Sequence, residues 1–161
     1  MPAGLGVNMC ADLWSFALST YARPGVEAAC LRLQEQGADV CLLLCAAWLE
    51  RRGVALAPER IHALQQVALP WQKNVVEPLR QVRLQWRAMA QLDLPLAALR
   101  ERVKTLELEA ERELLARLEV LTQAWPTEEG DQRGWLESLA AGAANLDPDA
   151  LQQWRVVASG T

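Results

Sequence analysis

Apolar residues recur at intervals of three and four along most of the chain, which is the spacing of one helix face. Alternating runs of β-branched residues, which are typical of strands, do not occur. Gly and Pro divide the pattern into segments. These segments predict helices at about 10–21, 25–36, 40–52, 58–69, 71–92, 96–124, 131–143 and 148–157. The chain is therefore predicted to be all-α, a bundle of about seven to eight helices.

The segment from Val40 to Leu49 is apolar on every side. A helix without a polar face is buried by its neighbours, so this segment is predicted to be the central helix. Asp39 lies just before it and is expected to cap its first turn. A second interpretation stays open, in which Asp39 also pairs with a buried cation, Arg80 or Arg83.

The two longest segments, about 71–92 and 96–124, are separated by a short loop that contains Pro95. Short loops join antiparallel neighbours, so the two segments are predicted to form a long helical hairpin. Pro70 is expected to break the chain before this hairpin. Pro78 should kink the first arm or mark its true start. The apolar seam of the second arm is predicted to be Leu99, Val103, Leu106, Ala110, Leu114, Leu118 and Leu121.

A chain of 161 residues has the size of one domain. It contains no internal repeat, low-complexity tract or interdomain linker. Residues 1–161 are therefore predicted to form a single helical domain. Within it, residues 126–161 are expected to add a loop and two short helices.

The net charge and the length of the apolar runs indicate where the protein is located and which partners it does not bind. The net charge of −4 argues against bulk nucleic-acid binding. The N-terminal residues do not have the pattern of a signal peptide. The longest apolar run, residues 40–49, is about half as long as a membrane-spanning helix. We therefore expect a cytoplasmic protein without a membrane segment.

Residues able to carry catalysis are sparse. His62 is the single histidine, and no Gly-x-Ser-x-Gly elbow or phosphate-binding glycine loop is present. The cysteines, Cys10, Cys30, Cys41 and Cys45, include no Cys-x-x-Cys pair, so we expect reduced, buried thiols in place of a zinc site. No catalytic residue, metal site or cofactor is predicted, and the balance favours a protein that is not an enzyme.

The most distinctive polar feature is a basic strip on the first arm of the hairpin. Lys73, Arg80 and Arg87 are seven residues apart, and Arg83 lies one turn from the last two. The segment 73–104 carries seven basic and three acidic side chains, whereas 105–161 carries four and eleven. The strip is either a solvated face with intramolecular ion pairs or a surface that binds a carboxylate, a phosphate or an acidic partner. The acidic residues available for such ion pairs are Glu77 on the same arm and Glu107, Glu109, Glu111 and Glu113 on the second arm.

Tryptophan is unusually frequent, with seven residues spread along the chain. Trp14, Trp48, Trp71 and Trp86 could line a groove between the early helices and the hairpin, although tryptophan at helical spacing more often belongs to a core. The candidate binding residues are therefore Lys73, Arg80, Arg83, Arg87, Asp39, Trp14, Trp48 and Trp71.

Three stretches carry a resemblance to a known family: LWSFA at 13–17, GADV at 37–40 and VEPLR at 76–80. Together with Trp71 and Arg83, they are similar to an uncharacterised family of proteobacterial proteins, over about residues 10–125. The resemblance implies a bacterial cytosolic protein. It implies no activity, cofactor or catalytic residue.

Two functional hypotheses follow from these patterns. The first is a non-enzymatic helical module that binds a protein or acidic partner, or itself, through the basic helix face. The second is a small-molecule-binding protein or enzyme for an anionic or diphosphate-bearing metabolite, with tryptophans as apolar walls and Lys73, Arg80 and Arg83 as an anion clamp.

Overall fold

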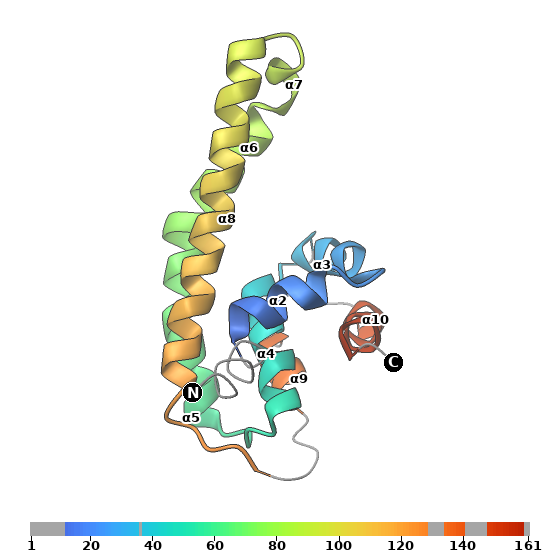
Figure 1. The fold of residues 1–161 in the computed structure, drawn as a ribbon, viewed down its shortest axis with the longest axis vertical. Helices are drawn as coiled ribbons and strands as arrows, with labels where there is room; N and C mark the ends of the chain where they lie inside the picture. The colour runs from blue at the N-terminus through green and yellow to red at the C-terminus, as the bar shows by residue number, and fades with distance from the viewer. Residues whose placement is uncertain (1–11, 36, 129–133, 141–147, 160–161) are drawn as a thin grey trace, which may run out of the picture.

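The computed structural model describes residues 12–35, 37–128, 134–140 and 148–159, and these residues fold into one packed helical body (Figure 1). They contain no β-strand, only an isolated bridge between Val54 and Thr127. The all-α prediction is confirmed, and eight helices result when 58–85 is counted as one continuous helix. The elements are α2 (Leu13–Tyr21), α3 (Val26–Glu35), α4 (Val40–Arg52), α5 (Pro58–Trp71), the π-helical segment η1 (Gln72–Val76), α6 (Glu77–Gln85), α7 (Arg87–Ala90), α8 (Leu94–Thr122), α9 (Trp135–Ala140) and α10 (Pro148–Ser159). Parts of the expected helices at 10–21, 25–36 and 131–143 lie outside the described residues.

Helix α4 is the centre of the body, as its missing polar face predicted. Its residues from Val40 to Ala46 are all buried, as are Trp48 and Leu49. Asp39 caps the first turn by accepting a hydrogen bond from the Leu42 N–H at 3.3 Å. The neighbours of α4 are α2, α3, α5, α8, α9 and α10.

Gly53 ends α4 and fixes the chain that returns from α8. Its φ of 73° is in the left-handed region, which glycine adopts without strain. Its carbonyl accepts a hydrogen bond from the Glu128 N–H at 2.7 Å. A Cβ at this position would overlap the Glu128 carbonyl oxygen, so the close approach of the two backbones requires glycine.

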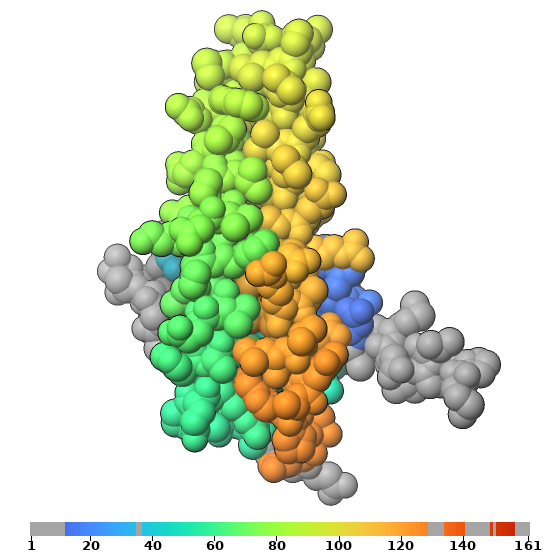
Figure 2. Space-filling view, turned by 90° about the vertical axis from the view of Figure 1, so that its left-hand side faces the viewer, coloured from blue at the N-terminus to red at the C-terminus, as the bar shows by residue number. Residues whose placement is uncertain are grey.

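A long antiparallel hairpin forms one side of the molecule, as predicted (Figures 1 and 2). Its first arm is α5–η1–α6 and its second arm is α8. The expected break at Pro70 is wrong, because α5 runs through Pro70 into η1 without interruption. Pro78 follows the π-helical turns as the second residue of α6. Both prolines are exposed, so the carbonyls that they leave unpaired face solvent, where water can satisfy them.

The outer half of the hairpin projects beyond the body (Figure 1). There α8 packs only against α6 and α7, among the described elements. The predicted seam is therefore right at Ala110, Leu114 and Leu118, which are buried, and wrong at Leu99 and Leu106, which are exposed.

Helices α9 and α10 close the core from the C-terminal side. Trp135 of α9 is fully buried and donates its indole N–H to the Val54 carbonyl at 2.7 Å. Trp154 of α10 is also fully buried and donates to the Cys30 sulfur at 3.0 Å. On the surface above them, Arg155 pairs with Glu50 of α4 and Glu137 of α9. No helix of the described residues is long and apolar enough to cross a bilayer.

Candidate functional site

Three charged residues join the two arms of the hairpin where it leaves the body. The Arg80 Nε lies 3.1 Å from Glu107 Oε2, and the Arg83 Nε lies 2.6 Å from Glu107 Oε1. The Glu107 side chain is only 8% exposed, and the two arginines are about one-fifth exposed. Burial alone would raise the pKa of Glu107, but the hydrogen bonds and charges of both guanidinium groups outweigh it and lower that pKa. Two cations thus share one carboxylate.

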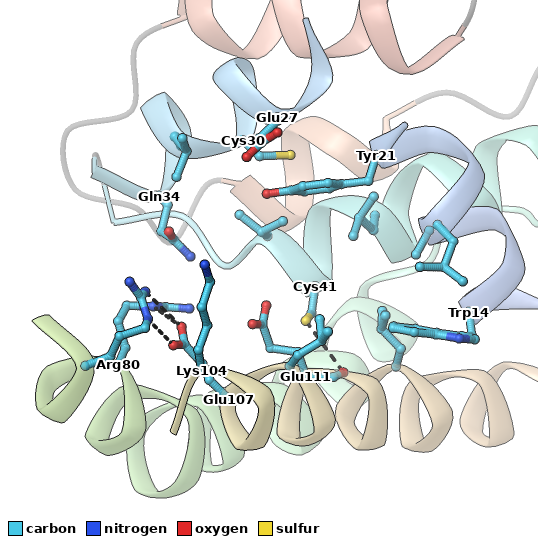
Figure 3. Close-up of a pocket in the computed structure, with 18 residues that line it drawn as sticks. Trp14, Tyr21, Glu27, Cys30, Gln34, Cys41, Arg80, Lys104, Glu107 and Glu111 are labelled. Carbon is cyan, nitrogen blue, oxygen red and sulfur yellow. Dashed lines mark hydrogen bonds and ion pairs between the residues drawn. The ribbon is translucent and has the colours of Figure 1, made fainter. Parts of the chain in front are cut away.

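A cavity of about 400 Å³ lies beside this cluster, between α8 and the helices α2, α3 and α4 (Figure 3). Such a volume is in the range of small-molecule sites. Trp14 lies toward one end and Arg80 with Glu107 toward the other. Most of the wall is apolar, formed by Trp14, Ala17, Leu18, Leu31, Val40, Leu44, Leu108 and Leu115. Because some of these residues are exposed, the cavity opens to solvent.

Five polar side chains from three helices line the cavity without a side-chain hydrogen bond to another described residue (Figure 3). They are Tyr21 of α2, Glu27 and Gln34 of α3, and Lys104 and Glu111 of α8. Tyr21, Glu27 and Lys104 are exposed, whereas Gln34 and Glu111 are half-buried. Unpaired polar groups that converge in an apolar cavity are free to contact a ligand.

The Glu111 carboxyl differs from Glu107 in its protonation. Burial raises the pKa of Glu111 to about 7, and the charges of Glu107 and Asp39 act in the same direction. The charges of Arg80 and Arg83 oppose this rise but do not cancel it. At neutral pH, Glu111 is therefore close to half-protonated and can donate or accept a hydrogen bond.

Two thiols on the cavity wall remain neutral at physiological pH. Burial raises the pKa of Cys30 to about 11 and that of Cys41 well above its usual range. Cys41 also directs its thiol to the Glu111 carbonyl at 3.9 Å. Since the thiolate is the nucleophilic form, these cysteines line the cavity as apolar groups.

Comparison with protein families gives one match. Residues 12–118 match the family described as "Protein of unknown function (DUF2390)". The chain belongs to this family. The predicted resemblance to an uncharacterised family is thereby confirmed, with a slightly shorter extent than the expected 10–125. No curated protein and no solved structure matches the chain.

The DUF2390 match contains every lining residue of the cavity, from Trp14 to Leu115. It does not contain α9 or α10, although both complete the core around α4 and α3. The cavity is therefore a feature of the family region, and its supporting core extends beyond that region.

Three of the candidate residues predicted from the sequence line the cavity: Arg80, Arg83 and Trp14. Lys73 and Arg87 are exposed and lie outside the lining. Arg80 and Arg83 form ion pairs with Glu107. For these two residues, the structure therefore agrees with the interpretation of the basic strip as a face with intramolecular ion pairs. The strip is not one continuous free surface.

Asp39 lies behind the cavity wall. Its carboxylate caps α4 and accepts a hydrogen bond from the Gln72 side chain at 2.9 Å, while its second oxygen, Oδ2, has no hydrogen-bond partner among the described residues. Burial raises the pKa of Asp39 to about 6. Arg80 acts on it only through its charge, because the contact partner of Arg80 is Glu107.

The other two predicted tryptophans, Trp48 and Trp71, pack within the protein and do not face the cavity. Trp48 is buried in the core with the Arg52 guanidinium 4.3 Å above its ring. Trp71 donates to the Ala110 carbonyl at 2.9 Å and lies under Arg117 at 4.0 Å. Neither lines the cavity.

Sequence reasoning did not select Tyr21, Gln34, Lys104 or Glu111. For the last two, a signal was present, because positions 104, 107 and 111 are three and four residues apart and share one face of α8. That face borders the seam residues Ala110 and Leu114, so its charges had to lie near apolar neighbours. Within the described residues, no three His, Cys, Asp or Glu side chains are placed to hold a metal ion.

Proposed function

We propose that this protein binds a small amphipathic molecule in the cavity between α8 and α2–α4. The observation that carries the proposal is the convergence of Tyr21, Gln34, Lys104 and Glu111, without hydrogen-bond partners among the described residues, on a cavity with a mostly apolar wall and a charged end. A bound molecule would satisfy these groups with its polar end and cover the apolar wall with its body.

Pairing within the hairpin favours this function over binding through the basic helix face. Arg80 and Arg83 direct their Nε atoms at Glu107, so a protein partner on that face would compete with an internal carboxylate. Only Lys73 and Arg87 of the strip are exposed, and they are fourteen residues apart. A ligand in the cavity meets Arg80 and Arg83 without breaking their ion pairs.

The experiment is titration with N-phenyl-1-naphthylamine, an uncharged probe whose fluorescence rises in apolar surroundings. We expect saturable binding of one probe per chain. Ala17→Leu adds bulk to the buried cavity wall and should weaken binding by about tenfold or more. Ala28→Leu, the same substitution on the exposed face of α3, is the matched control and should bind as the wild type does.

A second variant that fills the cavity is needed in case Ala17→Leu weakens binding only because it folds poorly. Leu31→Trp enlarges an exposed side chain at the cavity wall and should weaken probe binding while the far-UV circular dichroism stays unchanged. Wild-type protein that shows no saturable signal, or folded variants that bind as well as Ala28→Leu does, would refute the cavity as the binding site.

A specific observation also favours the alternative, an interaction module. Leu92 and Leu94 at the projecting end of the hairpin are 94% and 85% exposed, beside the exposed Met89. The segment 84–104 carries four basic and two acidic side chains, which suits a partner with an acidic surface around an apolar pocket. Such a partner would bind the end of the hairpin and leave the cavity free.

For this alternative, a photo-crosslinking amino acid at position 92 should give one dominant adduct in the native host. The same amino acid at Val120, an exposed position near the opposite end of α8, should not give it. The identified partner, once purified, should bind the wild type more weakly as salt rises, and Arg87→Glu with Arg102→Glu should abolish binding. An adduct of two copies of this chain, or binding that is insensitive to salt and charge reversal, would count against an acidic partner.

A further inference from the structure

The polar end of the cavity has more hydrogen-bond donors than acceptors. Lys104 offers three N–H groups, and Gln34 and Tyr21 add an amide and a hydroxyl, none with a side-chain partner among the described residues. Arg80 contacts Glu107 only through its Nε, so its terminal N–H groups remain available. The carboxyls beside these donors are those of Glu107, which the two arginines engage, the exposed Glu27 and the half-buried Glu111 (Figure 3).

The formal charges at this end of the cavity also favour an anionic ligand. Arg80 and Arg83 share the single charge of Glu107, which leaves one positive charge uncompensated, and Lys104 adds a second. Glu27 lines the cavity from α3 and is exposed to solvent, as Lys104 is, so its negative charge counts against that of the lysine. The net charge of the lining is then +1 while Glu111 is neutral. This charge suits a head group with one negative charge and is small for a doubly charged phosphate.

Glu111 does not act as a fixed opposing charge. Its pKa of about 7 means that an anion bound nearby, which favours the neutral form, would bring a proton onto this carboxyl at modest cost. The protonated carboxyl then donates a hydrogen bond in place of repelling the anion. A cationic head group would instead meet the positive charges of Lys104, Arg80 and Arg83 at close range.

The apolar part of the wall specifies an apolar body. It includes Trp14 and Leu18 of α2, Leu31 of α3, Leu44 of α4 and Leu115 of α8. Burial of an alkyl chain against these side chains removes apolar surface from water, which favours binding.

We infer that the ligand is a monoanionic amphiphile with a carboxylate head, bound by Lys104, Tyr21 and Gln34 beside the Arg80–Arg83–Glu107 cluster, with its apolar chain toward Trp14. The inference rests on the proposed function, because it names the ligand class of the same cavity. The carboxylate accepts hydrogen bonds from the donors, and Glu111 takes up a proton as the anion binds.

Three probes with the same chain and different heads test the inference: decanoate, decanol and decylammonium, each used below its micelle concentration to displace N-phenyl-1-naphthylamine. Decanoate should displace the probe at a concentration about tenfold lower than decanol does, and decylammonium should be the weakest. Lys104→Gln should remove the advantage of decanoate and leave decanol unchanged. Lys73→Gln, which removes an exposed lysine outside the cavity, is the matched control and should change neither.

The proton taken up at Glu111 gives an independent readout. Above pH 7 Glu111 is a carboxylate and opposes the anion, so decanoate should bind about tenfold more weakly at pH 8.5 than at pH 6, while decanol should not change. Glu111→Gln should abolish this pH dependence. The variant is needed because Asp39, with a pKa of about 6, also titrates near this range. The groups that act on or line the cavity around Glu111 are Asp39, Cys41, Arg80, Arg83, Lys104, Glu107, Tyr21, Glu27 and Cys30.

The outcomes separate the two proposals. Equal displacement by decanoate and decanol, or tightest binding of decylammonium, would overturn the carboxylate head and leave a ligand-binding cavity in place. A pH dependence that persists in Glu111→Gln would overturn proton uptake at Glu111. Failure of the wild type to bind N-phenyl-1-naphthylamine or any of the three amphiphiles would overturn the proposed function itself.

Discussion

Replacement of Glu107 by alanine should lower the free energy of unfolding by about 2–4 kcal/mol. The substitution leaves the guanidinium groups of Arg80 and Arg83, each about four-fifths buried, without their shared carboxylate. Breaking a buried ion pair from one side costs more than the pair contributes, because the remaining charge stays desolvated. The expected loss of stability is smaller than for a fully buried ion pair, because water still reaches both arginines. Urea denaturation followed by circular dichroism measures the effect.

Two controls identify the cause. Glu109→Ala removes an exposed carboxylate from the same helix and should change the stability by no more than about 0.5 kcal/mol. A triple variant, Glu107→Leu with Arg80→Met and Arg83→Met, removes all three charges and should recover most of the lost stability. If Glu107→Ala is no less stable than Glu109→Ala, the cluster does not hold the arms of the hairpin together.

Trp135→Ala should destabilise the protein by about 3–5 kcal/mol, the range for a large aromatic residue removed from a core. Trp135 is fully buried, stacks on Trp125 with ring centroids 6.0 Å apart, and satisfies the Val54 carbonyl. The substitution opens a void beside α4 and also leaves that carbonyl without its donor. The midpoint and slope of urea denaturation report the loss.

Trp86→Ala provides the comparison at a half-buried tryptophan of the projecting hairpin, and it should cost much less. Trp135→Phe keeps an aromatic ring but removes the N–H and part of the indole volume, so its cost of about 1–3 kcal/mol combines the unsatisfied carbonyl with a smaller void. Equal midpoints for Trp135→Ala and Trp86→Ala would show that α9 is not part of the cooperative core. Since α9 lies outside the DUF2390 match, the experiment also tests whether the family region depends on it.

Local patterns predicted the elements of this fold well, because their causes are local. The all-apolar run from Val40, with Asp39 before it and Gly53 after it, indicated both the bounds and the burial of α4. The rule that proline interrupts a helix failed at Pro70 and located only a change of helix type near Pro78. It failed because both prolines face solvent, and exposure depends on how the arm packs against α8.

The candidate site was predictable only in part. Arg80 and Arg83 stood out because they repeat along one helix, whereas Tyr21 and Gln34 gave no periodic signal of their own. Their importance arises from the packing of α2 and α3 over α8, which brings together residues up to ninety positions apart, such as Tyr21 and Glu111. The sequence offered five acidic residues as partners for the arginines, and only the packing of the two arms selects Glu107 among them.

Helices α9 and α10 pack on α4 and α3 and are made last, so the complete core can form only late in synthesis. Trp135 follows its hydrogen-bond partner Val54 by 81 residues in the sequence, and Trp154 follows Cys30 by 124 residues. At the usual rates of translation, the apolar surface of α4 emerges on the order of ten seconds before α9 has been made. Contacts so distant in sequence also slow folding, since long loops must close before these contacts form. During synthesis the central helix α4 therefore lacks the cover of α9 and α10 until the chain is almost complete, and apolar surface exposed in this way is bound by chaperones at the ribosome.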